Sequence, residues 1–167
     1  MIDYQAADSF GVPQRIFGNH KEDFYAGIGR IALLASLLEH HVRLLAKKLA
    51  APDPKGKPQT SIDSVIKHAR KGLCRIDEHT QREKIAGFLS EAKRLVARRN
   101  FYLHSIWPAQ ADGTLFAWKA EPWETSERTS KEALQQDIAA FVELNDRWKQ
   151  VWPLVSGRPD AGAEATS

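Results

Sequence analysis

The sequence predicts an all-α fold, a bundle of four main helices with a small β-hairpin between the last two. Apolar side chains recur every three or four residues over long segments, the spacing that places them on one face of a helix. A capping-box pattern, in which a side-chain acceptor is followed three residues later by an acid, lies at the start of four of these segments. The 167 residues suit one domain with its own core. We expect that domain to span residues 1–155, with a disordered tail at 156–167.

The first helix is predicted over residues 20–50. Its apolar residues alternate between steps of four and three, and three leucines form a second stripe beside this seam, so two faces are predicted to be buried. The seam consists of Phe24, Ile28, Ile31, Ala35, Leu38, Val42, Leu45 and Leu49, and the stripe of Leu34, Leu37 and Leu44. The proline- and glycine-rich segment 51–59 is a loop.

Three more helices are predicted over residues 61–73, 81–105 and 130–152. The capping boxes are Asn19 with Glu22, Thr60 with Asp63, Thr80 with Glu83, and Thr129 with Glu132. Between the third and fourth helices, Asp112-Gly113 is a dipeptide typical of hairpin turns, and 114–119 has the composition of a strand. We therefore expect a β-hairpin over residues 106–120.

Composition and charge exclude several classes of protein. The single cysteine, Cys74, excludes an internal disulfide and a multi-cysteine zinc site. No apolar run approaches the roughly 20 residues that cross a bilayer, and the first residues lack the pattern of a secretory signal, so we expect a cytoplasmic protein with no membrane partner. The net charge of +3 is unevenly spread, with four bases and no acid from Lys67 to Arg75. Such a basic centre is either a nucleic-acid surface or a solvated helix face.

Signatures of phosphate-binding loops, dinucleotide sites and zinc proteases are absent from the sequence. Glu39, His40 and His41 are metal-capable groups, but adjacent helical residues diverge by about 100° and do not easily share one ion. We predict neither a metal site nor a cofactor.

The end of the third helix carries the run Arg99-Asn100-Phe101-Tyr102-Leu103-His104. In a chain of this composition, an arginine followed by a histidine four to six residues later is expected about once by chance. Requiring asparagine directly after the arginine lowers the expected number of chance occurrences to about 0.01. The Arg-Asn-x-x-x-His pattern resembles the motif of HEPN domains. The resemblance implies a bundle of four or five helices, dimerisation that brings two motifs together, and metal-independent cleavage of RNA.

The three residues of this motif suit one task. Asn100 and His104 are four apart and lie on the same helix face, within reach of the long side chain of Arg99. Histidine exchanges protons near neutral pH, the guanidinium fork binds phosphate oxygens, and the amide would orient either partner. One histidine does not easily act as both base and acid, which favours a homodimer with a second copy of the motif. The resemblance implies products with a 2′,3′-cyclic phosphate and a 5′-hydroxyl.

Structural readings of the same residues stay open. Arg99 is alternatively a buried, ion-paired arginine, and His104 a partner of the helix dipole. Lys93, Arg94 and Arg98 are candidates for tracking RNA phosphates or are solvated side chains. The tryptophans of this region either stack on bases or pack the hairpin; they are Trp107, Trp118 and Trp123.

The resemblance has one departure. HEPN toxins paired with a nucleotidyltransferase antitoxin carry a tyrosine two positions after the histidine, where this chain has Ile106, so regulation through that tyrosine is not expected. The first hypothesis is a HEPN-type endoribonuclease acting on RNA in a toxin or phage-defence setting, with an antitoxin or regulatory protein as candidate partner. The alternatives are a non-catalytic HEPN-like module that binds RNA, a nucleotide or a protein, and an unrelated dimeric α-bundle.

Overall fold

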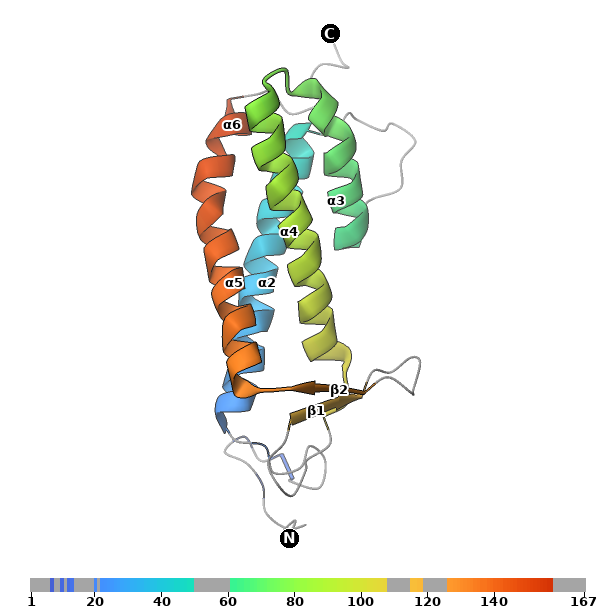
Figure 1. The fold of residues 1–167 in the computed structure, drawn as a ribbon, viewed down its shortest axis with the longest axis vertical. Coiled ribbons are helices and arrows are strands. Elements are labelled where there is room, and N and C mark those ends of the chain that lie inside the picture. The colour runs from blue at the N-terminus through green and yellow to red at the C-terminus, as the bar shows by residue number, and fades with distance from the viewer. Residues whose placement is uncertain are drawn as a thin grey trace. The chain divides into compact units, whose positions relative to one another are not determined.

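The structure is a computed structural model, and it describes Ala7, Phe10, Val12, Pro13 and His20 together with residues 22–49, 61–107, 115–118 and 126–157. The described part is mainly helical, which confirms the predicted class (Figure 1). Its elements are α2 (Glu22–Leu49), α3 (Ile62–Lys71), the short 3-10 helix η1 (Gly72–Arg75), α4 (His79–His104), β1 (Leu115–Trp118), β2 (Ser126–Thr129), α5 (Lys131–Val151) and α6 (Pro153–Ser156).

The chain divides into two compact units, whose boundaries fall inside the long helices. The first unit comprises Met1–Ala32 and Arg98–Ala139, and the second comprises Leu33–Ala97 and Ala140–Ser167. The first unit therefore holds the start of α2, the end of α4, both strands and the start of α5.

The second unit has a core of aliphatic side chains and two phenylalanines. The part of the predicted α2 seam that lies in this unit, from Ala35 to Leu49, is buried, and α3 buries one of its faces. The second stripe of α2 is less buried than predicted, since Leu34 and Leu44 are half-buried and Leu37 is 46% exposed. The fully buried larger side chains of this unit are Leu38, Leu45, Leu49, Ile66, Ile76, Ile85, Phe88, Leu89, Leu95 and Phe141.

Two helix starts are capped one residue later than predicted. The hydroxyl of Ser61 accepts a hydrogen bond from the amide of Ser64 (3.2 Å), which makes Ser61 the N-cap of α3. In the same way Ser130 accepts from the amide of Ala133 (3.1 Å) ahead of α5. Both sites are Thr-Ser pairs, and in each the serine hydroxyl satisfies a free amide of the first turn.

The other two predicted boxes have different outcomes. Helix α4 begins at His79, so Thr80 is a helical residue and its assignment as a cap was wrong. Asn19 lies outside the described residues.

A two-stranded antiparallel ladder belongs to the first unit. It pairs β1 with β2 in a register that sets Leu115 opposite Thr129 and Trp118 opposite Ser126. A strand was expected at 114–119, and β1 lies there; its described partner, β2, follows it in the sequence. The turn and the segment 108–114 lie outside the described residues, as does 158–167 of the predicted tail.

Candidate functional site

The motif residues lie in the last two turns of α4, within the first unit. Arg99 and Asn100 are half-buried, and Arg99 Nη1 donates a hydrogen bond to Asn100 Oδ1 over 2.8 Å. His104 is the last residue of α4, one turn beyond Asn100 on the same helix face, and its side chain is exposed. The structure therefore brings a guanidinium and an amide together directly before a solvent-accessible imidazole.

Arg98 is held in a different arrangement from its neighbour. Its Nε and Nη2 lie 2.9 and 2.8 Å from Oδ2 of Asp137 on α5, and the guanidinium carbon lies 4.8 Å from the centre of the Phe101 ring. The side chains of Arg98 and Asp137 are 26% and 13% exposed. An ion pair so far withdrawn from water, with an aromatic ring against the cation, gives Arg98 a structural task at this position.

Tyr102 completes this polar cluster. Its hydroxyl donates to Asp137 Oδ2 (2.8 Å) and accepts a hydrogen bond from Arg98 Nη2 (3.2 Å). Burial is the main cause that raises the pKa of Tyr102 above its ordinary value, and the hydrogen bond to the charged Asp137 raises it further. Tyr102 therefore stays protonated at neutral pH and acts as a hydrogen-bond donor.

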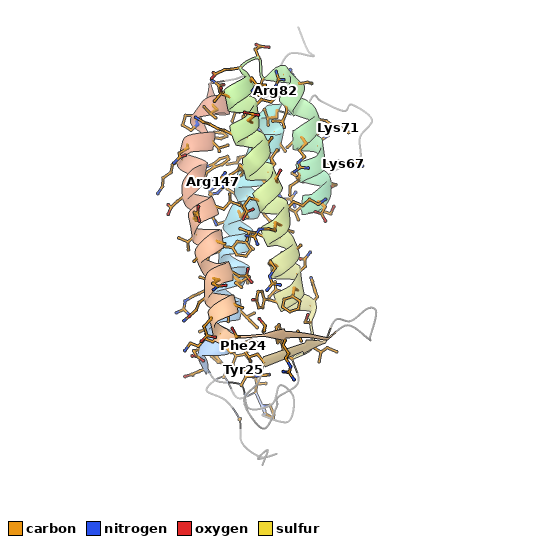
Figure 2. The ribbon with its side chains drawn as sticks, in the orientation of Figure 1. Phe24, Tyr25, Lys67, Lys71, Arg82 and Arg147 are labelled. Carbon is orange, nitrogen blue, oxygen red and sulfur yellow. The ribbon has the colours of Figure 1, made fainter. Side chains whose placement is uncertain are left out.

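Trp107 is half-buried in a group of aromatic rings. Its indole Nε1 donates to the carbonyl of Tyr102 (3.0 Å), and its own carbonyl accepts a hydrogen bond from His20 Nε2 (2.8 Å). The indole lies parallel to the Tyr102 ring at 5.9 Å and meets Phe24 edge-on at 5.1 Å. Phe24 and its neighbour Tyr25 come from the first turns of α2 (Figure 2). Trp107 therefore has a packing role, but against rings of α2 and α4 and not in the hairpin for which it was considered. Trp118 lies on β1, and Trp123 lies outside the described residues.

Lys93 and Arg94 belong to the second unit. Both are exposed, and Arg94 pairs with Glu91 on the preceding turn, with Nη2 2.6 Å from Oε1. The hydrogen bond from Arg94 is the main cause that lowers the pKa of Glu91. No carboxylate among the described residues lies within ion-pair distance of Lys93.

Three features of this region were not predicted. Asp137 belongs to none of the motifs in the sequence, and no local pattern links it to Arg98, 39 residues earlier. His20 belongs to no motif either, although its ring lies 4.9 Å from that of Phe24 and its Nε2 hydrogen-bonds to the carbonyl of Trp107. Leu103 and Ile106, on either side of His104 and Ser105, are 39% and 50% exposed. Only the apolar character of the last two was visible in the sequence.

Comparison with known proteins finds no match among family models, curated proteins or solved structures. Within the described residues, no group of three or more His, Cys, Asp or Glu is arranged to hold a metal ion. None of the helices described has the length and apolar character that crossing a membrane requires.

Proposed function

We propose that this chain is a HEPN-type endoribonuclease that cleaves RNA without a metal ion at a site composed of two motifs in a homodimer. The observation that carries the proposal is the hydrogen bond of Arg99 to Asn100 on the turn directly before the exposed His104. It combines a phosphate-binding cation, an amide and a proton-transferring group at one helix end, which is the set that the 2′-hydroxyl mechanism needs.

In the proposed reaction, the imidazole of His104 removes the proton of a ribose 2′-hydroxyl. The freed oxygen attacks the adjacent phosphorus, and the bond from phosphorus to the 5′-oxygen breaks. Arg99 stabilises the additional negative charge on the phosphate because its guanidinium stays charged and donates two parallel hydrogen bonds. The departing 5′-oxygen takes a proton from the protonated imidazole of the second motif, which leaves a 2′,3′-cyclic phosphate and a 5′-hydroxyl.

The dimer is supported by apolar side chains near the motif. Leu103 and Ile106 are 39% and 50% exposed beside His104, and exposed apolar groups next to a polar site are common in protein interfaces. A second copy seated there would cover both side chains and bring its own His104 to the substrate. A toxin or phage-defence setting, with an antitoxin or regulatory protein as partner, is part of the proposal that rests on the motif's resemblance alone.

The test uses the two histidines that begin and end α4. Purified wild type, His104→Ala and His79→Ala are incubated with single-stranded and structured RNA in excess EDTA, and the product ends are identified. Wild type and the control His79→Ala are expected to cleave and leave cyclic phosphates. His104→Ala is expected to be slower by at least about 100-fold, the lower range for general acid–base catalysis.

A folded wild-type protein that binds RNA without cleaving it would contradict the proposal and favour the non-catalytic module. Equal loss of cleavage in His79→Ala and His104→Ala would contradict the assignment of the histidine. Circular dichroism of each variant checks that the helices are intact.

A further inference from the structure

The exposed face of α3, in the second unit, is a row of cations. Helix α3 buries Ile62, Val65, Ile66 and Ala69. On the opposite side Lys67 and Lys71 are exposed and lie one turn apart (Figure 2). Arg70 is exposed next to them, on the flank of the helix that faces α4. From Ser64 to Ile76 the chain carries four bases and no acid, and Asp63 in the first turn is the one acid of α3, so the face keeps a net positive charge.

One side chain of this row also fixes how α3 meets α4. Arg70 Nη2 donates to Ser90 Oγ on α4 over 2.6 Å, and Ser90 Oγ donates in turn to the carbonyl of Ala86 (2.8 Å). The cation face of α3 is therefore tied to the part of α4 that carries Ser90. Three residues further along α4, Lys93 adds another exposed cation.

The surface of α4 around Ser90 is built from small residues. Gly87 and Ser90 are exposed, and a Cβ added at Gly87 would meet no atom within 4 Å. A polymer backbone can therefore approach α4 closely at Gly87 and Ser90. Small residues alone would not define a site, but here they lie beside the row of cations.

The cations of this face have no acidic partners within the described part of the chain. No carboxylate there lies within ion-pair distance of Lys67, Lys71 or Lys93; the exposed Asp63 is one turn before Lys67, and Glu91 pairs with Arg94 instead. In contrast, two other arginines considered as phosphate-binding residues, Arg94 and Arg98, are engaged by Glu91 and Asp137. Uncompensated charge thus lies on α3 and at Lys93.

We propose that Lys67, Arg70 and Lys71 of α3, together with Ser90 and Lys93 of α4, form a docking surface for the phosphate backbone of single-stranded RNA. Charge complementarity argues for a polyanion, because regularly spaced ammonium groups release the counterions of successive phosphates. A single strand fits the proposed reaction, which needs a flexible ribose at the cleavage site. The inference thus rests on the proposed function for its choice of RNA, while its geometry comes from the second unit alone.

The experiment measures binding separately from cleavage. A fluorescein-labelled, single-stranded 2′-O-methyl RNA cannot be cleaved by 2′-hydroxyl attack, and its anisotropy is followed against protein from about 50 to 200 mM salt. The variant Lys67→Gln/Lys71→Gln is compared with the matched control Lys84→Gln/Lys149→Gln, which removes the same charge from exposed lysines of the same unit. Lys67→Arg/Lys71→Arg tests whether charge alone suffices.

We expect the α3 variant to bind at least about tenfold more weakly at low salt and to lose about 1.4 from the slope of log affinity against log salt, or 0.7 for each phosphate contact. The control is expected to change affinity less than about threefold, and the arginine variant to bind like wild type. Equal losses in the α3 variant and the control would overturn the proposal, because they would reflect net charge only. Equally tight binding of duplex DNA would overturn the choice of single-stranded RNA.

The outcomes also separate this inference from the proposed activity. Loss of binding in the α3 variant, with no cleavage by wild type in EDTA, would support the docking surface and contradict the nuclease. Cleavage by wild type, with unchanged binding by the α3 variant, would support the nuclease and contradict the docking surface.

Discussion

Arg98 and Asp137 form an ion pair in which two nitrogens of the guanidinium reach one carboxylate oxygen, at 2.8 and 2.9 Å. The pair joins α4 to α5 in the first unit, and Arg98 directly precedes the motif residue Arg99. Because the hydroxyl of Tyr102 donates to the same oxygen, three donor groups from two side chains depend on one carboxylate. The orientation of the last two turns of α4 therefore depends on Asp137.

Replacing Asp137 is expected to destabilise the protein more than replacing a comparable exposed acid. Asp137→Asn weakens the bonds to Arg98 and Tyr102 and leaves the cation poorly compensated, which we expect to lower the free energy of unfolding by about 2 kcal/mol. Tyr102→Phe removes one hydrogen bond and is expected to cost about 1 kcal/mol. Urea unfolding measures both changes. The control is Asp63→Asn at an exposed position, which is expected to change the free energy of unfolding by less than about 0.5 kcal/mol. Equal effects of Asp63→Asn and Asp137→Asn would refute this account of the ion pair.

Asn100 is expected to act on cleavage through Arg99. In Asn100→Ala the guanidinium loses the acceptor at 2.8 Å, and we expect the rate of RNA cleavage to fall about tenfold, or about 1.4 kcal/mol of transition-state stabilisation. Arg99→Lys keeps the charge and loses the planar fork, so it is expected to bind RNA normally and cleave it more slowly than Asn100→Ala. Single-turnover assays separate the two effects. Loss of RNA affinity in Asn100→Ala, with the rate of the bound complex unchanged, would contradict a positioning role.

The proposed dimer is expected to depend on the apolar side chains near His104. Leu103→Asp/Ile106→Asp places two charges in the expected contact, so we expect a monomer that no longer cleaves RNA. A matched control is Leu33→Asp/Leu37→Asp, which changes two leucines of α2 that are 75% and 46% exposed. Light scattering coupled to size exclusion gives the mass of each variant. A dimer that survives the first pair and dissociates with the second would assign the interface to α2 instead.

Two glycines of α2 are expected to respond oppositely to the same change. A Cβ at Gly27 would lie 2.5 Å from Cδ2 of the buried Leu134 on α5, whereas a Cβ at Gly29 would meet nothing within 4 Å. Gly29→Ala is therefore expected to stabilise the protein by about 1 kcal/mol through helix propensity. Gly27→Ala gains the same propensity but must displace Leu134, and we expect a net loss of about 1 kcal/mol. Thermal unfolding of the two variants checks the sign, and stabilisation by both would show that Leu134 repacks freely.

Stability is expected to fall on acidification because of His41 in the second unit. Its ring stacks on Trp148 at 4.5 Å, and burial followed by the nearby His40 lowers its pKa below 6.5. Below pH 6.5 the unfolded chain therefore takes up a proton that the folded protein resists, so the free energy of unfolding drops by up to about 1.4 kcal/mol per pH unit until the lowered pKa is reached. His41→Phe keeps a stacked ring without the proton and should flatten the pH dependence in urea unfolding between pH 7.5 and 5. An unchanged dependence would assign it to other groups.

Local patterns in the sequence predicted the helices well because a helix places residues three and four apart on one face. The seam of α2 could be read from its spacing, and most of its members are buried. Capping is less certain at Thr-Ser pairs, since both hydroxyls are suitable acceptors and the first helical turn selects one of them. In both α3 and α5 the helix begins one residue later than the threonine requires, and the serine caps it.

Contacts between distant segments could not be predicted in the same way. Arg98 and Arg99 are adjacent and chemically identical, and no spacing indicates which of them meets Asp137. The pairing of β1 with β2 likewise depends on where the chain returns after residue 118, and no turn dipeptide between the two strands indicates it. The motif was visible as residues in order, but the hydrogen bond of Arg99 to Asn100 and the exposure of His104 required the structure.

Trp107 has a consequence for the motions of the helix that precedes it. Its indole is bound to the carbonyl of Tyr102, its carbonyl is bound by His20, and the amide of Ser105 still donates to Phe101. Helix ends ordinarily fray and exchange their amide hydrogens quickly, but these bonds should make the amides of the final turn of α4 exchange slowly. The backbone that carries His104 is then already ordered before any ligand arrives, so little conformational entropy remains to be lost on binding.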